Sequence, residues 1–322
     1  MYHGQIIETG SYIPKAVVTN EALSKIVETS DEWIFSRTGI KERRIAIEES
    51  VSDMASYAAL DSLKRSNVDP SEIDMIVVAT VSADFAMPSA ACIVQKNIQA
   101  TNAFCFDLQA ACSGFVYGLE VIEQFIQTGK VKKALLIGVE KLSQLLNWED
   151  RGTCVLFGDG AGAVLLGATS EKTGVLDTKS KSIGEQFEAL VSPLRNNDTP
   201  FYKQNKEPFL VMDGRAVFQF ACTKVSELLL ERLDVCNMSS DDIDLYVLHQ
   251  ANGRIIESIA KRLKQPIEKF YMNMERYGNT SAATIPIALD ELNKLGLLAG
   301  KKVAMAGFGA GLTYASAFVQ FK

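Results

Sequence analysis

Largely apolar runs alternate along this chain with segments whose apolar residues recur at helical spacing. The runs at 73–80, 134–139 and 303–307 have the composition of strands that are buried on both faces. After residue 112 the apolar residues stand three and four positions apart, as on one face of a helix: Phe115, Leu119, Ile122, Phe125 and Ile126. Because such strands and helices alternate, we predict an α/β fold with right-handed crossovers and mainly parallel sheets.

The two halves of the chain repeat the same pattern. Two pairs of segments match at offsets of 170 and 169 residues: 72–74 with 242–244, and 132–136 with 301–305. An internal repeat of this kind indicates a duplicated fold. We therefore predict an N-terminal half at 1–170 and a C-terminal half at 171–322, with helices sandwiched between two sheets about a pseudo-two-fold axis.

The repeat also predicts where a site lies. Ligands of such sheets bind at the carboxyl ends of the strands, and equivalent turns of the two halves can meet in one cleft. The turn at Cys112 falls opposite the turn at Asn279, 167 residues later, so both residues are expected to face one site. The polar stretch from 168 to 208 is expected to form hairpins and loops between the halves.

The composition of the 322 residues narrows the class of protein. A hydrophobic content of 47% and a net charge of −6 are typical of globular proteins and disfavour general nucleic-acid binding. No apolar run approaches the ~20 residues that span a bilayer, and the N-terminus lacks a secretory pattern, so we expect a cytoplasmic protein without membrane association. The six cysteines contain no C-x-x-C pair, which disfavours zinc and redox sites.

One cysteine stands where a predicted strand meets a predicted helix. The strand at 101–106 precedes Cys112, and the helix begins close to it. Free N–H groups and the helix dipole favour negative charge there, so a nucleophilic thiol with a lowered pKa is one interpretation. The other is a small core cysteine at a tight turn. The turn by itself favours this second interpretation, because cysteine is among the most buried residue types.

Two further residues could supply polar chemistry. His249 ends an apolar strand and is one of only two histidines, and Asn279 precedes Thr-Ser in a turn before a predicted helix. By themselves these residues fit a structural histidine and an ordinary N-cap asparagine. The glycine-rich turn after 303–307 fits either a plain tight turn or a loop that approaches a ligand. No Walker A or dinucleotide motif accompanies it.

Together these motifs resemble those of the β-ketoacyl-acyl-carrier-protein synthase III family. Three motifs carry the resemblance: Ala-Ala-Cys112-Ser-Gly-Phe, Leu-His249-Gln-Ala-Asn-Gly-Arg and Arg-Tyr-Gly-Asn279-Thr-Ser-Ala-Ala. The segments 31–40 and 157–163 match as well, so the resemblance runs nearly the full chain in matching order. It implies the thiolase fold, in which two βαβαβαββ halves build αβαβα layers. It also implies a homodimer that initiates fatty-acid synthesis.

The resemblance implies a catalytic triad of Cys112, His249 and Asn279. Cys112 would take the acyl group from an acyl-CoA primer, and the N–H groups of Cys112 and Ala310 would form the oxyanion hole. His249 and Asn279 would stabilise the enolate left when malonyl-acyl carrier protein loses CO2, in a decarboxylative Claisen condensation. No metal is expected, and no cofactor other than the coenzyme A thioester that serves as substrate.

Further positions carry over from the same resemblance. Trp33, Arg37 and Arg151 match residues that bind the nucleotide side of coenzyme A, and Arg254 matches a carrier-protein docking position. Met87 stands where relatives commonly have a phenylalanine that limits the acyl pocket across the dimer. Methionine is more pliable, so a longer or branched primer is expected to fit.

Two further positions depart from the family pattern, and two alternative functions stay open independently of them. Ala310 replaces a glycine, with a slight effect expected if its φ is negative, and Gln219 replaces a basic residue on a helix that could dock the carrier. A same-fold condensing enzyme or acyltransferase of specialised metabolism is one alternative, which turnover of malonyl carrier would distinguish. The other is an inactive acyl-CoA-binding scaffold, which would bind ligand without releasing CO2.

Overall fold

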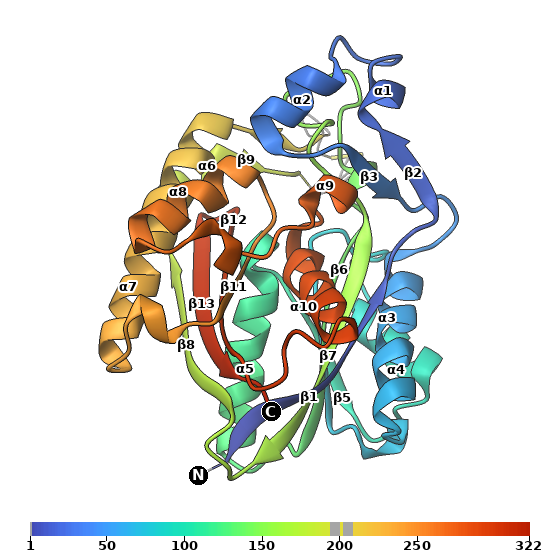
Figure 1. The fold of residues 1–322 in the computed structure, drawn as a ribbon. Helices are drawn as coiled ribbons and strands as arrows, with labels where there is room; N and C mark the ends of the chain where they lie inside the picture. Colours follow the sequence, from blue (N-terminus) through green and yellow to red (C-terminus); the bar gives the residue numbers. More distant parts are fainter. Residues whose placement is uncertain (1, 194–199, 202–208) are drawn as a thin grey trace.

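Two sheets with the same strand arrangement form the centre of the molecule (Figure 1). The computed structural model describes residues 2–193, 200–201 and 209–322. In spatial order, the N-terminal sheet consists of β1 His3–Tyr12, β7 Gly160–Thr169, β6 Lys133–Glu140, β4 Met75–Ala79 and β5 Phe104–Leu108. The C-terminal sheet consists of β8 Gly174–Ser182, β13 Thr313–Gln320, β12 Lys302–Gly309 and β11 Leu245–Leu248.

The strand pairings repeat between the two sheets. β4 runs parallel to β6, β6 antiparallel to β7, and β7 antiparallel to β1. In the second sheet the same directions hold for β11 with β12, β12 with β13, and β13 with β8. The counterpart of the fifth strand, β5, is a single parallel bridge between Tyr246 and Phe270. The duplicated fold is confirmed, but the sheets are mixed instead of mainly parallel, because β7 and β13 return antiparallel beside β6 and β12.

Helices form three layers around the sheets (Figure 1). α5 Gly114–Gln127 and α10 Thr284–Lys294 lie between the sheets and pack on both. α3 Val51–Ser66 and α4 Ala90–Ile98 cover the outer face of the N-terminal sheet. The C-terminal sheet is covered by one broken helix and one continuous helix: α6 Gly214–Phe220, a π-helical turn η5 Ala221–Val225, α7 Ser226–Val235, and α8 Gly253–Leu263. This order confirms the αβαβα layers.

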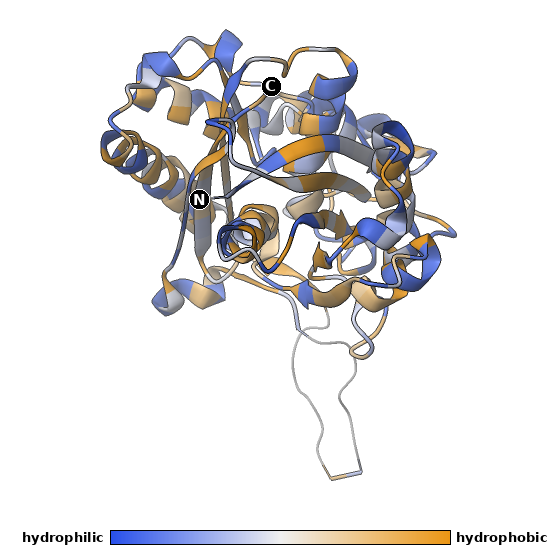
Figure 2. Cartoon of the chain, turned by 90° about the horizontal axis from the view of Figure 1, so that it is seen from below, coloured by the Kyte–Doolittle hydropathy of each residue, from blue (hydrophilic) through white to orange (hydrophobic). Residues whose placement is uncertain are grey.

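Hydrophobic residues surround the central helices and occupy one side of the outer ones. α5 is buried on several faces, through Phe115, Val116, Leu119 and Ile122. α8 buries only its apolar stripe and exposes Arg254, Lys261 and Arg262. Figure 2 shows the corresponding alternation of hydrophilic and hydrophobic residues along the outer helices. A helix between two sheets packs against protein on several faces, whereas an outer helix meets solvent along one side, which explains the difference.

Shorter elements connect these layers. The two-stranded sheets are β2 Ala16–Thr19 with β3 Glu42–Ile45, and β9 Leu190–Val191 with β10 Val211–Met212. The short helices are α1 Asn20–Leu23, α2 Asp31–Thr38 and α9 Met274–Tyr277. The 3₁₀ turns are η1 Pro70–Glu72, η2 Ala111–Ser113, η3 Leu142–Gln144, η4 Gly184–Ala189, η6 Ser240–Asp242, η7 Ile267–Lys269 and η8 Ser281–Ala283.

The segment that joins the two sheets contains the predicted boundary between the halves. β7 ends at Thr169 and β8 begins at Gly174. Strands and helices of both halves share one hydrophobic cluster, so the division at 170 into domains stays a prediction. Residues 194–199 and 202–208 of the polar stretch lie outside the described residues. Over the described ranges, no helix has both the length and the apolar character to cross a bilayer.

Candidate active site

Two equivalent 3₁₀ turns, η2 and η8, contact each other in the centre of the molecule. Each begins with a residue of positive φ, 46° at Ala111 and 49° at Ser281, and each leads into a central helix. The register of the two turns follows from these residues, which lie 170 positions apart. It corrects the pairing expected from the sequence, because the counterpart of Cys112 is Ala282 and not Asn279.

Each turn packs against the central strand of the other half. A Cβ atom at Gly309 of β12 would lie 2.7 Å from the Cys112 nitrogen. A Cβ atom at Gly138 of β6 would lie 2.1 Å from the carbonyl oxygen of Ala282. Only glycine permits backbones to approach so closely. The two halves are therefore interlocked at the turns that carry the predicted site residues.

Cys112 lies where two cavities meet. Cys112, His249 and Asn279 all line the smaller cavity, which has a volume of about 210 Å³. Cys112 also lines a larger cavity of about 750 Å³, together with Ser281 and Ala310. The structure thus brings the three residues of the predicted triad to one cavity, and it gives the sulfur access to a second.

His249 continues β11 beyond its last strand residue. Its backbone N–H donates to the carbonyl of Ala306 at 2.8 Å, and its buried ring lies edge-on to Phe308 with the centroids 5.0 Å apart. Nδ1 has no hydrogen-bond partner among the described residues. Burial lowers the pKa of His249 to about 3, so the imidazole is neutral at pH 7. A neutral ring carries one N–H and can donate one hydrogen bond to a substrate.

Asn279 is held through its backbone and its side chain. Its N–H donates to the carbonyl of Leu156 at 2.8 Å, and its carbonyl accepts from the N–H of Gly158 at 3.0 Å. Oδ1 accepts from the N–H of Ser281 at 2.9 Å. Because Oδ1 is occupied within the turn, the Nδ2 amide is the part of this side chain that can donate into the cavity.

The protonation state of the thiol differs from the sequence-based expectation. Burial raises the pKa of Cys112 to about 12, a hydrogen bond with the Ser281 side chain lowers it, and the charge of Glu140 raises it. The expected lowering of this pKa is therefore wrong. The helix start is present, but removing the sulfur from water disfavours its charged form more strongly than the helix favours it.

The loop after β12 lies against the turn of Cys112. The hydroxyl of Thr313 lies 2.8 Å from the carbonyl of Ala310 and 3.1 Å from that of Ala110, within hydrogen-bond distance of both. Ala310 has no positive φ, and the value of 133° falls on Gly311. The methyl group of Ala310 therefore costs no backbone strain, as expected.

An aromatic and two arginines form a stack at the surface. The guanidinium carbons of Arg37 and Arg151 lie 4.6 and 5.2 Å from the centroid of the Trp33 ring. The side chain of Asn252 donates to the carbonyl of Arg37 at 3.0 Å. Asn252 and Gly152 both line the smaller cavity, so the stack lies next to the cavity that ends at the thiol.

Two predicted site residues lie apart from both cavities. Arg254 is exposed on the first turn of α8. Met87 is 83% exposed and lines neither cavity as the described residues form them, so it could limit an acyl pocket only from a second copy of the chain. Phe85 lines the larger cavity instead. Sequence reasoning missed Phe85, although it lies only two residues before Met87.

Sequence reasoning also missed two polar residues next to Cys112. Ser281 stands two positions after Asn279, and Glu140 directly follows the apolar run at 134–139. The acidic Glu140 at the end of a predicted buried strand could have indicated a functional residue. Over the described part of the chain, no group of three or more His, Cys, Asp or Glu side chains could hold a metal ion.

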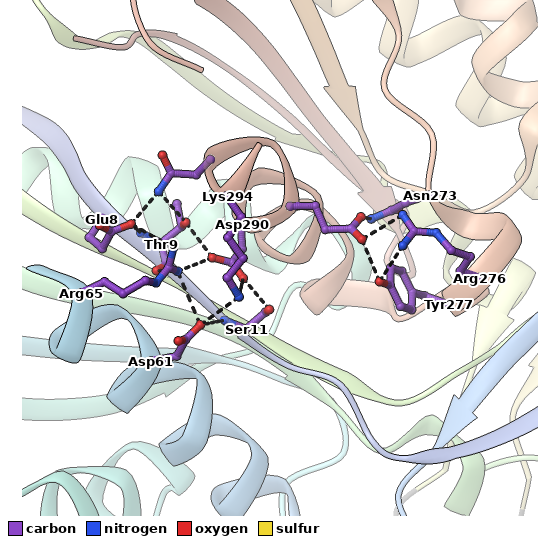
Figure 3. Close-up of polar contacts among 12 residues, drawn as sticks. Glu8, Thr9, Ser11, Asp61, Arg65, Asn273, Arg276, Tyr277, Asp290 and Lys294 are labelled. Carbon is purple, nitrogen blue, oxygen red and sulfur yellow. Dashed lines mark hydrogen bonds and ion pairs between the residues drawn. The ribbon is translucent and has the colours of Figure 1, made fainter. Parts of the chain in front are cut away.

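Two polar clusters anchor α10, the helix that follows the Asn279 turn (Figure 3). The buried carboxylate of Asp290 accepts from Thr9 at 2.8 Å and from Lys294 at 2.7 Å, and it is paired with Arg65. Among the described residues, the partners of the Glu291 carboxylate come from the segment just before Asn279: Tyr271, Asn273, Arg276 and Tyr277. These contacts hold α10 against the N-terminal half and hold the segment before Asn279 against α10.

The chain is similar to 3-oxoacyl-[acyl-carrier-protein] synthases III along most of its length. The family model described as 3-Oxoacyl-[acyl-carrier-protein (ACP)] synthase III matches residues 106–184, and the model of the C-terminal part matches residues 233–321. The β-ketoacyl-[acyl-carrier-protein] synthase III of Clostridium acetobutylicum is 51% identical over 315 residues, which are 97% of this chain and 97% of that one.

Solved structures agree with this relationship. The 3-oxoacyl-[acyl-carrier-protein] synthase III of Aquifex aeolicus superposes with a TM-score of 0.93 at 43% identity, covering 99% of this chain and 100% of that chain. The priming β-ketosynthase of the R1128 polyketide biosynthetic pathway superposes with a TM-score of 0.92 at 32% identity, covering 99% and 96%. The resemblance and the thiolase-like fold are confirmed: the chain belongs to the 3-oxoacyl-[acyl-carrier-protein] synthase III family of acyl-transferring condensing enzymes.

Proposed function

We propose that the protein is a β-ketoacyl-acyl-carrier-protein synthase III that holds an acyl group on Cys112 and condenses it with malonyl-acyl carrier protein. One observation carries the proposal. Cys112, His249 and Asn279, which come from three separate segments, line one cavity. The relatives named above are called β-ketoacyl- or 3-oxoacyl-[acyl-carrier-protein] synthases III, and the chain matches them in identity and in fold.

In the first half-reaction the Cys112 sulfur attacks the carbonyl carbon of an acyl-CoA thioester. The carbonyl oxygen then bears negative charge, and the N–H groups of Cys112 and Ala310 donate to it. Coenzyme A leaves and the acyl chain occupies the larger cavity. The stack of Trp33 with Arg37 and Arg151 binds the nucleotide end, because a purine adds to such a stack and the phosphates attract the guanidinium groups.

In the second half-reaction a malonyl thioester enters through the smaller cavity. Loss of CO2 leaves an enolate, and the neutral imidazole of His249 and the Nδ2 amide of Asn279 donate to its oxygen. Neither group needs to change its protonation state for this role. The enolate carbon attacks the acyl group on Cys112, which gives the 3-oxoacyl product and the free thiolate. No cofactor or metal takes part in these steps.

The proposal includes two protein partners. Arg254 is exposed where it can meet an acidic carrier protein, and opposite charges would speed their encounter. A second copy of the chain would cover the exposed apolar residues around the larger cavity, Phe85 at 59% and Met87 at 83% exposure. β5 pairs with a neighbour on one side only, which leaves an edge for the same contact. A homodimer in the cytoplasm remains the expected state.

One observation favours a second candidate function. The priming ketosynthase of a polyketide pathway shares the fold at 32% identity, so a starter role in specialised metabolism uses the same architecture. The higher identity of 51% to a β-ketoacyl-[acyl-carrier-protein] synthase III favours the primary proposal.

The test is a two-step assay on the full chain. Acetyl-CoA should acylate the wild-type protein on the peptide that contains Cys112, as seen by intact and peptide mass spectrometry. Malonyl-acyl carrier protein should then discharge the adduct with release of CO2, whereas the Cys112→Ser variant should do neither. If Cys112 is acylated but malonyl-acyl carrier protein does not remove the acyl group, the result would favour an acyltransferase or a condensing enzyme that uses another malonyl-type substrate. A primer series with acetyl-, butyryl- and isobutyryl-CoA tests the expectation for Met87.

A further inference from the structure

The acid next to Cys112 has no role in the steps above. Glu140 ends β6, is fully buried, and accepts hydrogen bonds from neutral donors only. These donors are the hydroxyls of Thr80, Ser82 and Ser281 and the backbone N–H of Val81. No cation is paired with it in the described part of the chain. A buried acid without a counter-ion is costly for a fold, so its presence beside the nucleophile calls for a function.

Ser281 connects Glu140 to the nucleophile. Its hydroxyl donates to Oε1 of Glu140 at 3.1 Å, and the same side chain, which lines the larger cavity together with Cys112, lowers the pKa of the Cys112 thiol. The backbone position is enforced by the positive φ of 49° and by the bond from its N–H to Asn279. A hydroxyl has one donor and two acceptor positions, so it can receive one proton while it passes on another.

The proposed reaction needs a proton acceptor, because the thiolate and not the thiol attacks the thioester. His249 is a poor acceptor, since burial lowers its pKa to about 3. Burial raises the pKa of Glu140 to about 7, against the opposing effect of its hydrogen bonds. Compared with His249, the carboxylate of Glu140 is therefore the stronger base at neutral pH.

We propose that Glu140 accepts the proton of Cys112 and that the Ser281 hydroxyl relays it. This inference rests on the proposed function, because it assigns the base for the acyl-transfer step. In the resting site Ser281 donates to Glu140 Oε1, which leaves the lone pairs of its Oγ to accept the proton of the Cys112 thiol. On activation the S–H bond of Cys112 breaks as Ser281 Oγ takes that proton, and the former Ser281 proton moves to Oε1.

The relay accounts for every proton in both half-reactions. Coenzyme A leaves as a thiolate and takes a proton from solvent, while Glu140 keeps the Cys112 proton during the lifetime of the acyl-enzyme. In the condensation, the electron pair of the breaking carboxylate bond forms the new carbon–carbon bond, and Cys112 leaves as a thiolate. Glu140 then returns its proton through Ser281. One proton is consumed overall, at coenzyme A.

Few other groups influence the carboxyl of Glu140. Cys112 of η2 is coupled to it by charge, and its hydrogen-bond partners are neutral residues: Thr80, Val81 and Ser82 after β4 and Ser281 of η8. Asp84 and Asp107 line the larger cavity as well, but their carboxylates accept from backbone N–H groups at the starts of α3 and α4. Lys141, the next residue of the chain, donates instead to the carbonyl of Glu49 at 2.8 Å. The pH dependence of Cys112 reactivity should therefore follow Glu140.

The sign of this dependence follows from the relay. Below about pH 7 Glu140 holds a proton and cannot accept another, so the reactivity of Cys112 falls as the pH decreases. Above that pH the thiol and the carboxylate share one proton, and the reactivity stays constant until the second proton of the pair begins to leave. Without the acceptor the thiol must ionise to water, and its reactivity would instead rise about tenfold per pH unit with no plateau.

The experiment measures alkylation of Cys112 by iodoacetamide in the full-length protein from about pH 5.5 to 9.5, the range that brackets the expected change. Peptide mass spectrometry separates Cys112 from the exposed Cys92. The wild type should show a plateau above neutral pH, and Glu140→Gln and Ser281→Ala should lose it and react more slowly at pH 7. If Glu140 acted only through its charge, Glu140→Gln would react faster, because a like charge next to the thiolate would be gone. That result would overturn the relay.

Two features keep the test decisive. Ser281→Ala is expected to fold, because alanine already occupies the equivalent backbone position at Ala111 with nearly the same φ. Ser82→Ala removes a hydroxyl from the other carboxylate oxygen without touching Cys112, so it should keep the plateau and shift its lower limit to higher pH. Loss of the plateau in Ser82→Ala as well would assign the effect to packing and overturn the relay.

Acetyl-CoA distinguishes the relay from the function on which it rests. A wild type that shows the plateau but is not acylated would contradict the proposed function and leave the relay standing. A wild type that is acylated, with an unchanged profile in Glu140→Gln, would contradict the relay alone. Glu140→Asp, which keeps a carboxylate, should restore the plateau in part.

Discussion

The turn that carries Cys112 and the turn that carries Asn279 share a backbone and differ in chemistry. Both begin with a positive φ, lead into a helix between the sheets, and touch a glycine of the other half. Yet Cys112 corresponds to Ala282, which has no functional group, and Ser281 corresponds to Ala111. The comparison teaches that duplication supplied two equivalent positions, and that the side chains then divided the reaction between them.

The strand ends next to the turns show the same division. β6 ends in Glu140, whereas the equivalent position at the end of β12 is Gly309, where a side chain would meet the Cys112 nitrogen. β11 continues into His249, whereas the equivalent position in β4 is Ala79. The N-terminal half thus supplies a thiol and an acid, and the C-terminal half supplies an imidazole, a carboxamide and a hydroxyl.

The largest effect is expected at the two central positions of the turns. Cys112→Ser should lower the rate of acylation by acetyl-CoA by about 10⁴-fold or more, because a buried hydroxyl is a far weaker nucleophile. Ala282→Ser introduces the same hydroxyl at the equivalent position and should leave an acylation rate within about tenfold of the wild type. Intact mass spectrometry after timed quenching measures both rates. An equal loss of acylation rate in the two variants would contradict the proposed difference between the turns.

The second comparison uses the two carboxamides that precede the turns. Asn279→Ala should lower CO2 release from malonyl-acyl carrier protein by about 10²–10³-fold, the cost of one lost donor to a developing oxyanion, and leave acylation nearly unchanged. His249→Ala should behave in the same way. Gln109→Ala, at the exposed counterpart of Asn279, should affect CO2 release by only a few-fold. A loss of acylation in Asn279→Ala would show that the halves do not separate the two steps.

The third comparison concerns the two glycines that interlock the halves. Gly309→Ala and Gly138→Ala should each lower the free energy of unfolding by about 1–3 kcal/mol, because the new methyl group meets backbone atoms of the opposite turn. Urea denaturation measures this loss. Gly309→Ala should impair acylation, and Gly138→Ala should impair CO2 release, since each displaces a different turn. Identical activity profiles would contradict this assignment.

The smallest effects are expected at the two clusters that anchor α10 (Figure 3). Tyr277→Phe removes a hydrogen bond of 2.7 Å to Glu291 and should cost about 1 kcal/mol of stability. Thr9→Val removes the 2.8 Å bond to the fully buried Asp290 and should cost about 1–3 kcal/mol, because the carboxylate loses a partner that water cannot replace. Thermal unfolding of both variants measures the two losses of stability. A larger loss in Tyr277→Phe than in Thr9→Val would contradict the expected order.

Much of the fold was predictable from local sequence patterns. The helical spacing after Cys112 indicated α5, and the apolar runs indicated β4 and β6. Buried strands and helices can be recognised in this way because the spacing of their apolar residues along the sequence follows the period of the element. The offset of about 170 residues indicated the duplication. The three motifs around Cys112, His249 and Asn279 indicated the family, since such a set in matching order is far more specific than any one of its members.

The sequence by itself thus determined the elements, the duplication and the family. Only the tertiary structure decided the raised pKa of Cys112, the register that pairs it with Ala282, the outward position of Met87, and the hydrogen bond from Ser281 to Glu140 beside the thiol. The physical reason is that hydrophobic periodicity and turns depend on neighbours in the chain. Burial, charge and proton acceptors depend instead on which distant segments pack around a residue.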